Sequence, residues 1–507
     1  MKNFLLTDDD KKQIQMFKNG VKYVNLHDAC SVGNGINIIS SDDYSELLGY
    51  FEKAILEKEL LLFIPASGAA SRMFKVLVSY NNKYDHIDRD LIRLNDNDND
   101  NDKEVLLEFI DNIYKFAFCD DLKSVMDKKG LNLDHLIENG QFKSIIDYLV
   151  SERGLSYSNI PKGLLKFHKC NGKETTALED HLSEAACYLK DKNNNCNIHL
   201  TVSSEHKQAF EKHIKNYESR CNIHYNLSIS VQKNSTDTLA VDLNDVPYRI
   251  NSGEILFRPG GHGALLENLN DVCGDIVFIK NVDNVVPEAN NKENCLWKKL
   301  LCGYFLQIQE KLFYYLKRLV NGNFDEKFVD NAMIFAKEKL NIVVQKDSSN
   351  LTCQQKKDFL IKMFNRPVRV CGMVKNEGEP GGGPYWVKST DNRQISIQIV
   401  EKEQVDAKSE QQQSIQRLST HFNPVDIVCG LRDYKGNQFE LTRFIDPETF
   451  LITTKSIQGE AIKVLEHPGL WNGSMADWIT ILIEVPNSTF NPVKTVNDLL
   501  CKKHIIN

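Results

Sequence analysis

The chain has 507 residues, of which 41% are hydrophobic and 26% are charged, so its composition is ordinarily globular and its length allows two or three packed lobes. Its net charge of -7 excludes the broad basic surface that non-specific binding to nucleic acid or to acidic membranes requires. Its 13 cysteines are scattered and odd in number, which disfavours a zinc site or a disulfide framework. Its apolar runs are too short for a signal peptide or a membrane span. We therefore expect a cytoplasmic protein.

The N-terminal region, residues 1–59, is predicted to be helical and to end in a helix over 44–58, where apolar residues recur at helical spacing. The pattern changes at 60–64, a short continuous apolar run that is typical of a strand buried on both faces. This strand opens the predicted core, residues 60–370, which includes a polar and mostly helical insertion at about 78–158.

Beyond the insertion, strand-like and helix-like segments alternate. Thr176 and Glu179 form a capping box that opens a helix ending near Lys190. The alternation predicts an α/β fold with three α/β/α layers, Rossmann-like, around a mixed and mostly parallel sheet. Further strands are predicted at 199–202, 227–231, 276–280, 368–374, 395–400, 425–429 and 479–485, and further helices at 205–217 and 296–320.

The loop after the first strand is the first segment with candidate chemistry. It contains Ser67, Gly68, Ala69 and Ala70 and ends at Arg72, ahead of a predicted helix. Small residues let the backbone approach a phosphate, a helix N-terminus adds N–H donors, and an arginine adds a fixed charge. The loop is not a Walker A loop, since no Gly-Lys-Ser/Thr follows, and it lacks the glycines of the dinucleotide fingerprint. A phosphate loop and a plain tight turn both fit it.

Two further loops are rich in glycine. The Pro-Lys-Gly at 161–163 puts Lys162 on constrained backbone from which it could reach a phosphate, although a surface lysine is the simpler interpretation of this tripeptide alone. The Gly-His-Gly at 261–263 forms a loop that can approach a ligand closely, and a purely structural loop is the alternative.

A metal ligand is predicted at the end of a buried strand. The apolar run at 276–280 leads into Asn-x-Asp-Asn at 281–284. Ligands of open α/β sheets bind at the carboxyl ends of strands. Asp283 is therefore a natural ligand for Mg²⁺, which usually takes one or two carboxylates plus substrate phosphates. An aspartate that caps the next helix is the alternative.

These four motifs, in this order, resemble those of the UDP-sugar pyrophosphorylases, which belong to the GT-A-like nucleotide-diphospho-sugar transferase superfamily. Those enzymes carry Gly-x-Gly-Thr-Arg, Pro-Lys-Gly, Gly-His-Gly and Asn-x-Asp-Asn, and the matching segments here are 68–72, 161–163, 261–263 and 281–284. The resemblance covers roughly residues 60–76 and 160–485. It implies a GT-A-like fold, with a nucleotidyltransferase-like core at 60–370 and a sugar-binding half of the core plus a tail at 371–507. Segments 371–374, 398–401 and 421–427 also follow the order of that family.

The chain looks closer still to a bacterial group, the domain-of-unknown-function family 4301. The hallmarks of that group stand here at 65–75, 235–238, 379–384 and 470–478. This second resemblance supports the fold rather than a particular substrate.

Two departures from the pyrophosphorylase pattern bear on activity. Ala70 stands where those enzymes have the second glycine of the loop, and its methyl group could block the closest approach to a triphosphate. A long helical insertion also separates Arg72 from Lys162. Both departures leave room for altered or lost catalysis.

The pyrophosphorylase resemblance implies that a nucleoside triphosphate, with UTP favoured, reacts with a sugar 1-phosphate to give a nucleotide-sugar and pyrophosphate. Asp283 is then expected to hold Mg²⁺ against the α-phosphate, with Asp477 as a candidate second metal ligand. Lys162 is expected to neutralise charge at the α-phosphorus, and Arg72 and Lys75 to stabilise the leaving pyrophosphate.

The same resemblance implies residues that bind the two substrates. The expected nucleotide-binding residues are Ser67, Gly68, Ala69, Gln232, Gly261, His262 and Gly263. Among these, Gln232 is the candidate for reading the edge of the base. The expected sugar-binding residues are Glu401, Asn423 and Asn472, and Asn472 is also a candidate metal ligand.

Two rival functions fit the same motifs. A glycosyltransferase on this fold would use Asp283 as its metal ligand and a nucleotide-sugar as donor, and it would release no pyrophosphate. A non-catalytic nucleotide-sugar sensor would bind without turnover, which Ala70 makes possible. The sequence leaves open which sugar, which base and which oligomeric state apply.

Overall fold

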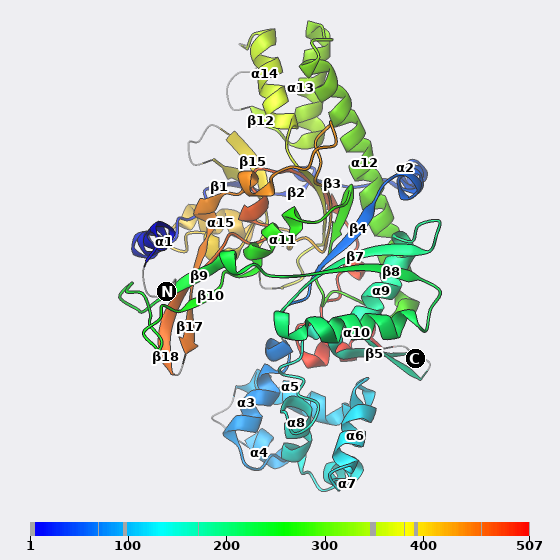
Figure 1. The fold of residues 1–507 in the computed structure, drawn as a ribbon, viewed down its shortest axis with the longest axis vertical. Helices are drawn as coiled ribbons and strands as arrows, with labels where there is room; N and C mark the ends of the chain where they lie inside the picture. Colours follow the sequence, from blue (N-terminus) through cyan, green and yellow to red (C-terminus); the bar gives the residue numbers. More distant parts are fainter. Residues whose placement is uncertain are drawn as a thin grey trace. The chain divides into compact units, whose positions relative to one another are not determined.

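The structure is a computed structural model that describes residues 6–68, 70–94, 99–170, 172–344, 351–379, 381–389, 394–457 and 459–505. The chain forms two compact units, each assembled from three segments that are distant in sequence (Figure 1). Unit 1 consists of Met1–Phe63, Ser230–Ile279 and Trp297–Thr489, and unit 2 consists of Ile64–Ile229, Lys280–Leu296 and Phe490–Asn507. These boundaries fall at other positions than the predicted domain boundaries at 59 and 370.

Unit 1 contains a large mixed sheet with the strand order β2-β3-β19-β13-β16-β11-β4. The pairs β3–β19, β19–β13 and β11–β4 are parallel, whereas β16 is antiparallel to both of its neighbours. The prediction of an α/β fold with a mixed sheet is confirmed. The strands are β2 Ser31–Val32, β3 Gly35–Asn37, β4 Leu60–Pro65, β11 Ile276–Ile279, β13 Val368–Met373, β16 Asp426–Gly430 and β19 Ile479–Glu484.

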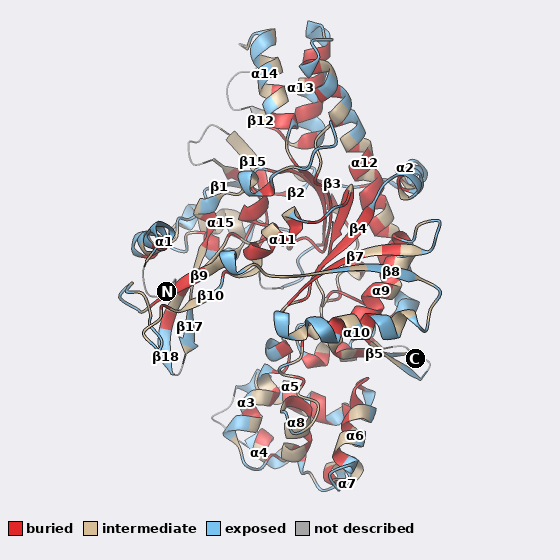
Figure 2. Cartoon of the chain, in the orientation of Figure 1, coloured by how far each residue is buried: buried red, intermediate tan, exposed pale blue. Residues whose placement is uncertain are grey.

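The central strands of this sheet are buried along their whole length. Every residue of β4, β11, β13 and β16 is buried, and these strands are drawn in red in Figure 2. Apolar side chains on both faces of a strand need cover on both faces, which explains the continuous runs such as Leu60–Pro65. The strands predicted at 60–64, 276–280, 368–374 and 425–429 are confirmed, with ends that differ by one residue.

Two smaller sheets of unit 1 are antiparallel in every described pair, and the prediction of one mostly parallel sheet did not include them. The predicted strand at 395–400 lies in one of them instead of in the large sheet. The first has the order β1-β14-β15-β12, with β1 Leu26–Ala29, β12 Val343–Val344, β14 Gly383–Lys388 and β15 Gln394–Val400. The second has the order β10-β9-β18-β17, with β9 Asp237–Val241, β10 Phe257–Pro259, β17 Leu451–Ile457 and β18 Glu460–Glu466.

The helices of unit 1 include the predicted helix at 44–58, which is α2, Tyr44–Glu57. Residues 1–59, predicted to be a helical region, contain the helices α1 and α2, but β1, β2 and β3 lie between them. These strands are only two to four residues long, and β1 and β3 pair with β14 and β19 far along the chain, so no local periodicity marks them. The other helices are α1 Asp8–Asn19, α11 Leu266–Asn270, α12 Lys292–Val320 (in unit 1 from Trp297), α13 Glu326–Leu340, α14 Cys353–Phe364 and α15 Glu410–Arg417, of which α13 and α14 pack side by side (Figure 1).

In unit 2, β7 Asn195–Val202 and β8 His224–Val231 continue the strand order from the end of β4. The N–H of Ala66, just after β4, donates to the carbonyl of Thr201 at 2.8 Å. The hairpin of β5 Lys166–Cys170 and β6 Lys173–Thr176 follows the insertion. The insertion is helical, as predicted, and its helices share one apolar core with each other. They are α3 Lys75–Lys83, α4 Arg89–Leu94, α5 Asp100–Asp111, α6 Cys119–Asp127, α7 Leu133–Glu138 and α8 Phe142–Val150.

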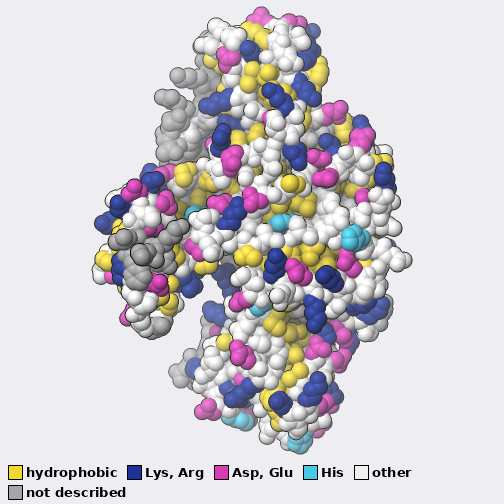
Figure 3. Space-filling model, viewed as in Figure 1, with side chains coloured by type: hydrophobic (Ala, Val, Ile, Leu, Met, Phe, Trp, Pro, Cys, Tyr) yellow, Lys and Arg dark blue, Asp and Glu magenta, His cyan; other side chains and the backbone are white. Residues whose placement is uncertain are grey.

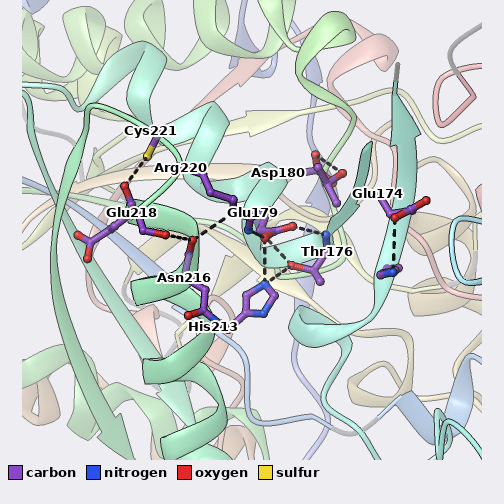
Figure 4. A network of polar contacts seen from close by, with 12 residues as sticks. Glu174, Thr176, Glu179, Asp180, His213, Asn216, Glu218, Arg220 and Cys221 are labelled. Carbon is purple, nitrogen blue, oxygen red and sulfur yellow. Dashed lines mark hydrogen bonds and ion pairs between the residues drawn. The ribbon is translucent and has the colours of Figure 1, made fainter. Parts of the chain in front are cut away.

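The predicted capping box opens α9, Ala177–Tyr188, and it belongs to a polar network with α10, Lys207–Glu218 (Figure 4). Thr176 Oγ1 accepts from the N–H of Glu179 at 3.2 Å, and the Glu179 carboxylate accepts from the N–H of Thr176 at 3.0 Å. His213 and Arg220 also contact Glu179. Although burial opposes ionisation, hydrogen bonds from His213 and the Thr176 backbone hold the pKa of Glu179 below its ordinary value. The network therefore fixes the start of α9.

The surface mixes charges of both signs. Figure 3 shows Lys and Arg side chains interspersed with Asp and Glu over the face that it draws, in keeping with the small net charge. Within the described ranges, no helix is both long enough and apolar enough to cross a membrane.

Candidate functional site

The predicted phosphate loop has the expected strand–turn–helix form in unit 2. Strand β4 ends at Pro65, a single 3-10 turn covers Ala70–Arg72, and α3 begins at Lys75. Ser67 is half-buried and Gly68 is exposed, and a Cβ atom built on Gly68 would meet open space. Ala69 lies outside the described residues.

The side chain of Ala70 points into the protein. It is fully buried and belongs to the apolar core of the helical insertion. Its N–H donates to the carbonyl of Ile160 at 3.1 Å. The methyl group that replaces a glycine hydrogen is therefore accommodated in the core, so the departure at this position leaves the exposed side of the loop unchanged.

Lys162 joins two of the motifs by direct contact. Its ammonium donates to Asp283 Oδ2 at 2.8 Å and to the carbonyl of Val493 at 2.7 Å. Its side chain is only 14% exposed, against 25% for Asp283, so the simpler interpretation of a surface lysine is wrong. Its backbone N–H donates to the carbonyl of Gly68 at 3.4 Å. The phosphate loop, the Pro-Lys-Gly turn and the Asn-x-Asp-Asn turn thus meet within unit 2.

Gly163 lets these turns approach each other. A Cβ atom there would lie 3.1 Å from the Phe210 ring and 3.4 Å from Val282 Cγ2, tighter than a side chain tolerates without movement. The Asn-x-Asp-Asn turn is held on its other side as well. The carbonyl of Asp283 accepts from the N–H of Val493 at 3.0 Å, and Asn284 Oδ1 accepts from the N–H of Asn491 at 2.8 Å.

The two other predicted cations flank the loop. Arg72 and Lys75 are exposed, and neither side chain makes a hydrogen bond or an ion pair with any residue that the structure describes. Arg72 ends the 3-10 turn and Lys75 begins α3. Both charges are therefore open to a ligand, whereas Lys162 is already paired with protein oxygens.

The Gly-His-Gly loop lies in unit 1, where packing explains its glycines. Gly261 has φ +77°, and a Cβ atom on it would lie 3.1 Å from Glu466 Cβ. A Cβ atom on Gly263 would lie 1.9 Å from the carbonyl oxygen of Pro468. The loop must therefore pass close to the segment after β18, whether or not it contacts a nucleotide.

His262 packs on an aromatic ring from a hallmark segment of family 4301. Its imidazole stands edge-on to Trp471, with ring centroids 4.3 Å apart. Burial lowers the pKa of His262 to about 4, so the ring is neutral near pH 7. Gln232, the predicted reader of the base, is half-buried and donates to Thr236 Oγ1 at 3.4 Å.

The three predicted sugar-binding residues form one cluster in unit 1. Glu401 Oε1 accepts from Asn472 Nδ2 at 2.8 Å and from Asn423 Nδ2 at 3.3 Å. A Cβ atom on Gly382 would lie 2.9 Å from Glu401 Oε2, so the glycine-rich segment at 381–383 packs directly against the cluster. Among the described residues, the buried Oδ1 atoms of Asn423 and Asn472 have no hydrogen-bond partner, so they could accept hydrogen bonds from a hydroxylated ligand.

The cluster brings together two hallmarks of the second family resemblance, and the comparison with protein families agrees. Residues 4–505 match the family described as Domain of unknown function (DUF4301). The chain belongs to this family. No curated protein matches the chain significantly.

Several solved structures are similar to this member of DUF4301. The UDP-N-acetylglucosamine pyrophosphorylase of Trypanosoma brucei is 11% identical with a TM-score of 0.47, and the match covers 97% of this chain and 74% of that chain. A UDP-glucose pyrophosphorylase of Leishmania major is 12% identical with a TM-score of 0.42, covering 96% and 73%. A UDP-glucose phosphorylase of Trypanosoma brucei is 14% identical with a TM-score of 0.44, covering 96% and 72%.

The predicted second metal ligand of this DUF4301 chain, Asp477, belongs to unit 1, whereas Asp283 belongs to unit 2. Its side chain is 63% exposed, and its nearest described cation is Arg366, whose Nη1 lies 4.0 Å from Asp477 Oδ1. In the described part of the chain, no three His, Cys, Asp or Glu side chains are grouped so that they could hold a metal ion. The role of Asp477 stays a prediction.

Sequence reasoning missed the contribution of residues 490–505 to the site in unit 2. Val493 contacts Lys162 and Asp283 through its backbone carbonyl and N–H alone. Such a role does not depend on the type of side chain, so no motif reveals it.

Proposed function

We propose that this member of DUF4301 is a nucleotidyltransferase that joins a nucleoside triphosphate, with UTP favoured, to a sugar 1-phosphate and releases pyrophosphate. The contact of 2.8 Å between Lys162 and Asp283 carries the proposal, because it joins two motifs that lie 121 residues apart in sequence. The carbonyl of Gly68 accepts a hydrogen bond from the N–H of Lys162, which adds the phosphate loop as the third motif. The order of these motifs supports the proposal, as does their resemblance to those of the UDP-sugar pyrophosphorylases, and a three-layer GT-A-like arrangement of the core is part of it.

In the proposed reaction, an oxygen of the sugar phosphate attacks the α-phosphorus in line, and the bond between that phosphorus and the bridging oxygen to the β-phosphate breaks. Such chemistry needs positioned charges more than proton transfer. Lys162 neutralises charge that develops on the α-phosphoryl oxygens. Arg72 and Lys75, whose charges are unpaired among the described residues, stabilise the pyrophosphate that leaves.

The acidic residues of unit 2 are compatible with Mg²⁺ as cofactor. Asp283 is one partly exposed carboxylate, and Mg²⁺ usually takes one or two carboxylates together with substrate phosphates. Asp283 would hold the ion, which when bound supplies positive charge against the phosphates. The ammonium of Lys162 shares this carboxylate, so it is already placed beside any phosphate that the ion brings to Asp283.

Glu401, Asn423 and Asn472 are proposed to bind sugar hydroxyl groups, and the unpartnered Oδ1 atoms of the two asparagines support this role. Gln232, His262 and the glycines at 261 and 263 are proposed nucleotide contacts in unit 1. Packing against the segment after β18 already accounts for those two glycines, so the proposal for them rests on the motif alone.

The test is pyrophosphate release from a matrix of nucleoside triphosphates and sugar 1-phosphates with Mg²⁺. We expect turnover by the wild type, and a loss of about a hundredfold or more in kcat for Lys162→Ala, as is typical of a charge that acts on the transition state. Lys169→Ala is the matched control, since Lys169 also pairs with an aspartate in unit 2 but lies outside these motifs. Binding without pyrophosphate would replace the proposal with a sensor. Transfer of sugar from a nucleotide-sugar would replace it with a glycosyltransferase.

A further inference from the structure

Residues 490–505 of unit 2, called here the strap, contact two of the three motifs that meet there and the residue that follows the third. The carbonyl of Val493 accepts from the Lys162 ammonium at 2.7 Å, and its N–H donates to the carbonyl of Asp283 at 3.0 Å. Three residues further on, the N–H of Val496 donates to the carbonyl of Met73, the residue after the phosphate-loop turn, at 3.2 Å. The strap thus lies alongside the proposed phosphate site through backbone groups.

The far end of the strap is fixed by a buried chain of hydrogen bonds. His168 Nδ1 lies 2.7 Å from Asp180 Oδ2, and His168 Nε2 lies 2.7 Å from His504 Nδ1. All three side chains are buried. Burial, together with the neighbouring His168 and Lys503, lowers the pKa of His504 to about 3, so its ring is neutral near pH 7. If His168 donates from Nδ1 to the Asp180 carboxylate, its Nε2 accepts from Nδ1 of His504.

The segment of the strap between Val493 and His504 is held by apolar packing and by hydrogen bonds. Val493, Val496 and Leu499 are buried in the apolar core of the helical insertion. A capping box between Thr495 and Asp498 opens the 3-10 helix Val496–Leu500. Asn497 adds a second anchor, because its Nδ2 donates to the Val105 carbonyl and to Glu108 Oε2, both at 2.8 Å.

We infer that the strap is a built part of the proposed phosphate site, and that His504 is a positioning residue that holds the Val493 carbonyl against the Lys162 ammonium. The ion pair between Lys162 and Asp283 can be broken by a ligand, because a cation competes for the carboxylate and a phosphate competes for the ammonium. The Val493 carbonyl keeps one of the three ammonium donors whatever happens at the carboxylate. The position of the strap rests on this geometry alone, and its effect on turnover rests on the proposed function.

Two substitutions of His504 test the inference. His504→Leu removes the donor to His168, whereas His504→Gln keeps an N–H that can replace it. We expect the amides of Val493 and Val496 to exchange with solvent about tenfold faster in His504→Leu, the change that corresponds to one lost buried hydrogen bond, and to recover to within about threefold in His504→Gln. Ile198→Val is the control, since it opens a small cavity in β7 of the same unit, outside the apolar core that holds the strap.

Kinetics then separate positioning from general destabilisation. If Lys162 acts on charge that develops in the transition state, kcat should fall about tenfold in His504→Leu with KM within about twofold, and His504→Gln should restore it. Strap amides in His504→Leu that exchange as in the wild type would overturn the inference, as would an equal change of exchange or kcat in Ile198→Val. If His504→Leu does not fold, Asn497→Ala carries the same test through the second anchor. A wild type without pyrophosphate release would end the proposed function, while the exchange data would still decide the role of the strap.

Discussion

Lys162 donates to two oxygens of different kinds, the Asp283 carboxylate and the Val493 carbonyl. An ammonium has three N–H donors, which leaves the third for a phosphate oxygen. Partly buried ion pairs of this kind contribute little net stability, because desolvation offsets the Coulomb attraction. The role proposed for Lys162, which is to place charge beside a phosphate, does not require this ion pair to stabilise the fold.

Arg72 differs from Lys162 in having no partner in the described chain, which yields a prediction about affinity. Arg72→Ala should weaken binding of a nucleoside triphosphate about tenfold, the loss of roughly one charge-assisted hydrogen bond, with no change in melting temperature because the side chain is exposed. Calorimetric titration and thermal unfolding measure the two quantities. Arg153→Ala is the control, since Arg153 is an exposed arginine in unit 2 that pairs with Asp147. Equal affinity in wild type and Arg72→Ala would remove Arg72 from the site.

The lowered pKa of His262 leads to a prediction of how the stability of unit 1 depends on pH. Burial lowers its pKa to about 4 from the ordinary 6.5, so the unfolded chain binds the proton more readily than the folded chain does. Its contribution to stability is therefore complete above pH 6.5 and is lost as the pH falls toward 4, with a slope that approaches about 1.4 kcal/mol per pH unit. Urea unfolding of wild type and His262→Gln at several pH values checks this. The substitution should flatten the acid limb, and parallel curves would show that His262 titrates normally.

At the scale of the elements, the buried strands were predictable and the edge strands were not. Strands β4, β11, β13 and β16 are buried on both faces, so each is a largely apolar run that can be recognised in the sequence. Strand β17 is half-buried or exposed throughout and is stabilised by pairing with β18, which carries no comparable local signal. The meeting of the turns at 161–163 and 281–284 followed from the family resemblance, whereas the strap that borders them acts through backbone atoms that no motif marks.

Two glycines that look alike in sequence should behave in opposite ways when replaced. Gly263→Ala would place a Cβ atom 1.9 Å from the Pro468 carbonyl, so we expect a loss of about 3 kcal/mol in the free energy of unfolding. Gly68→Ala would place one in open space, so stability should change by less than about 0.5 kcal/mol. If the phosphate loop binds a nucleotide, Gly68→Ala should nevertheless weaken that binding about tenfold, since the methyl group occupies the space beside the phosphates.

Denaturant unfolding and nucleotide titration of the two glycine variants test this contrast. If Gly263→Ala were as stable as the wild type, the segment after β18 would have to move away from the added methyl group at little energetic cost. Unchanged nucleotide affinity in Gly68→Ala would favour the plain tight turn over the phosphate loop.

At the scale of the whole molecule, each unit is assembled from segments that other parts of the chain interrupt. The family resemblance supplied the order of the motifs along the chain, but the two units alternate along it, so sequence order alone does not tell which motifs share a unit. The phosphate loop, Lys162 and Asp283 share unit 2, whereas the Gly-His-Gly loop and the cluster of Glu401 belong to unit 1. The residues proposed for phosphate chemistry therefore all belong to the same compact unit.

Ligand binding that depends on Asp283 should stabilise the folded chain by mass action. At a nucleotide concentration of 100 times Kd, with excess Mg²⁺, the wild type should gain about 2.7 kcal/mol and show a higher melting temperature. Removal of the metal with EDTA should abolish most of this gain, because the proposed bound state includes a hard cation held by Asp283. Asp283→Asn keeps the shape of the side chain but not its charge, so its ligand-induced gain should be small and the same with EDTA as with Mg²⁺.

The ligand-free comparison shows whether Asp283 acts in binding or in folding. Its ion pair with Lys162 is partly exposed, so Asp283→Asn should cost about 1 kcal/mol or less without ligand. Asp120→Asn is the matched control, because it removes the carboxylate from another pair of aspartate and lysine in unit 2, that with Lys169, and it should keep the full Mg²⁺-dependent gain. An equal response to Mg²⁺ in wild type and Asp283→Asn would take Asp283 out of the metal site, and with it the assignment of the phosphate chemistry to the contact between Asp283 and Lys162.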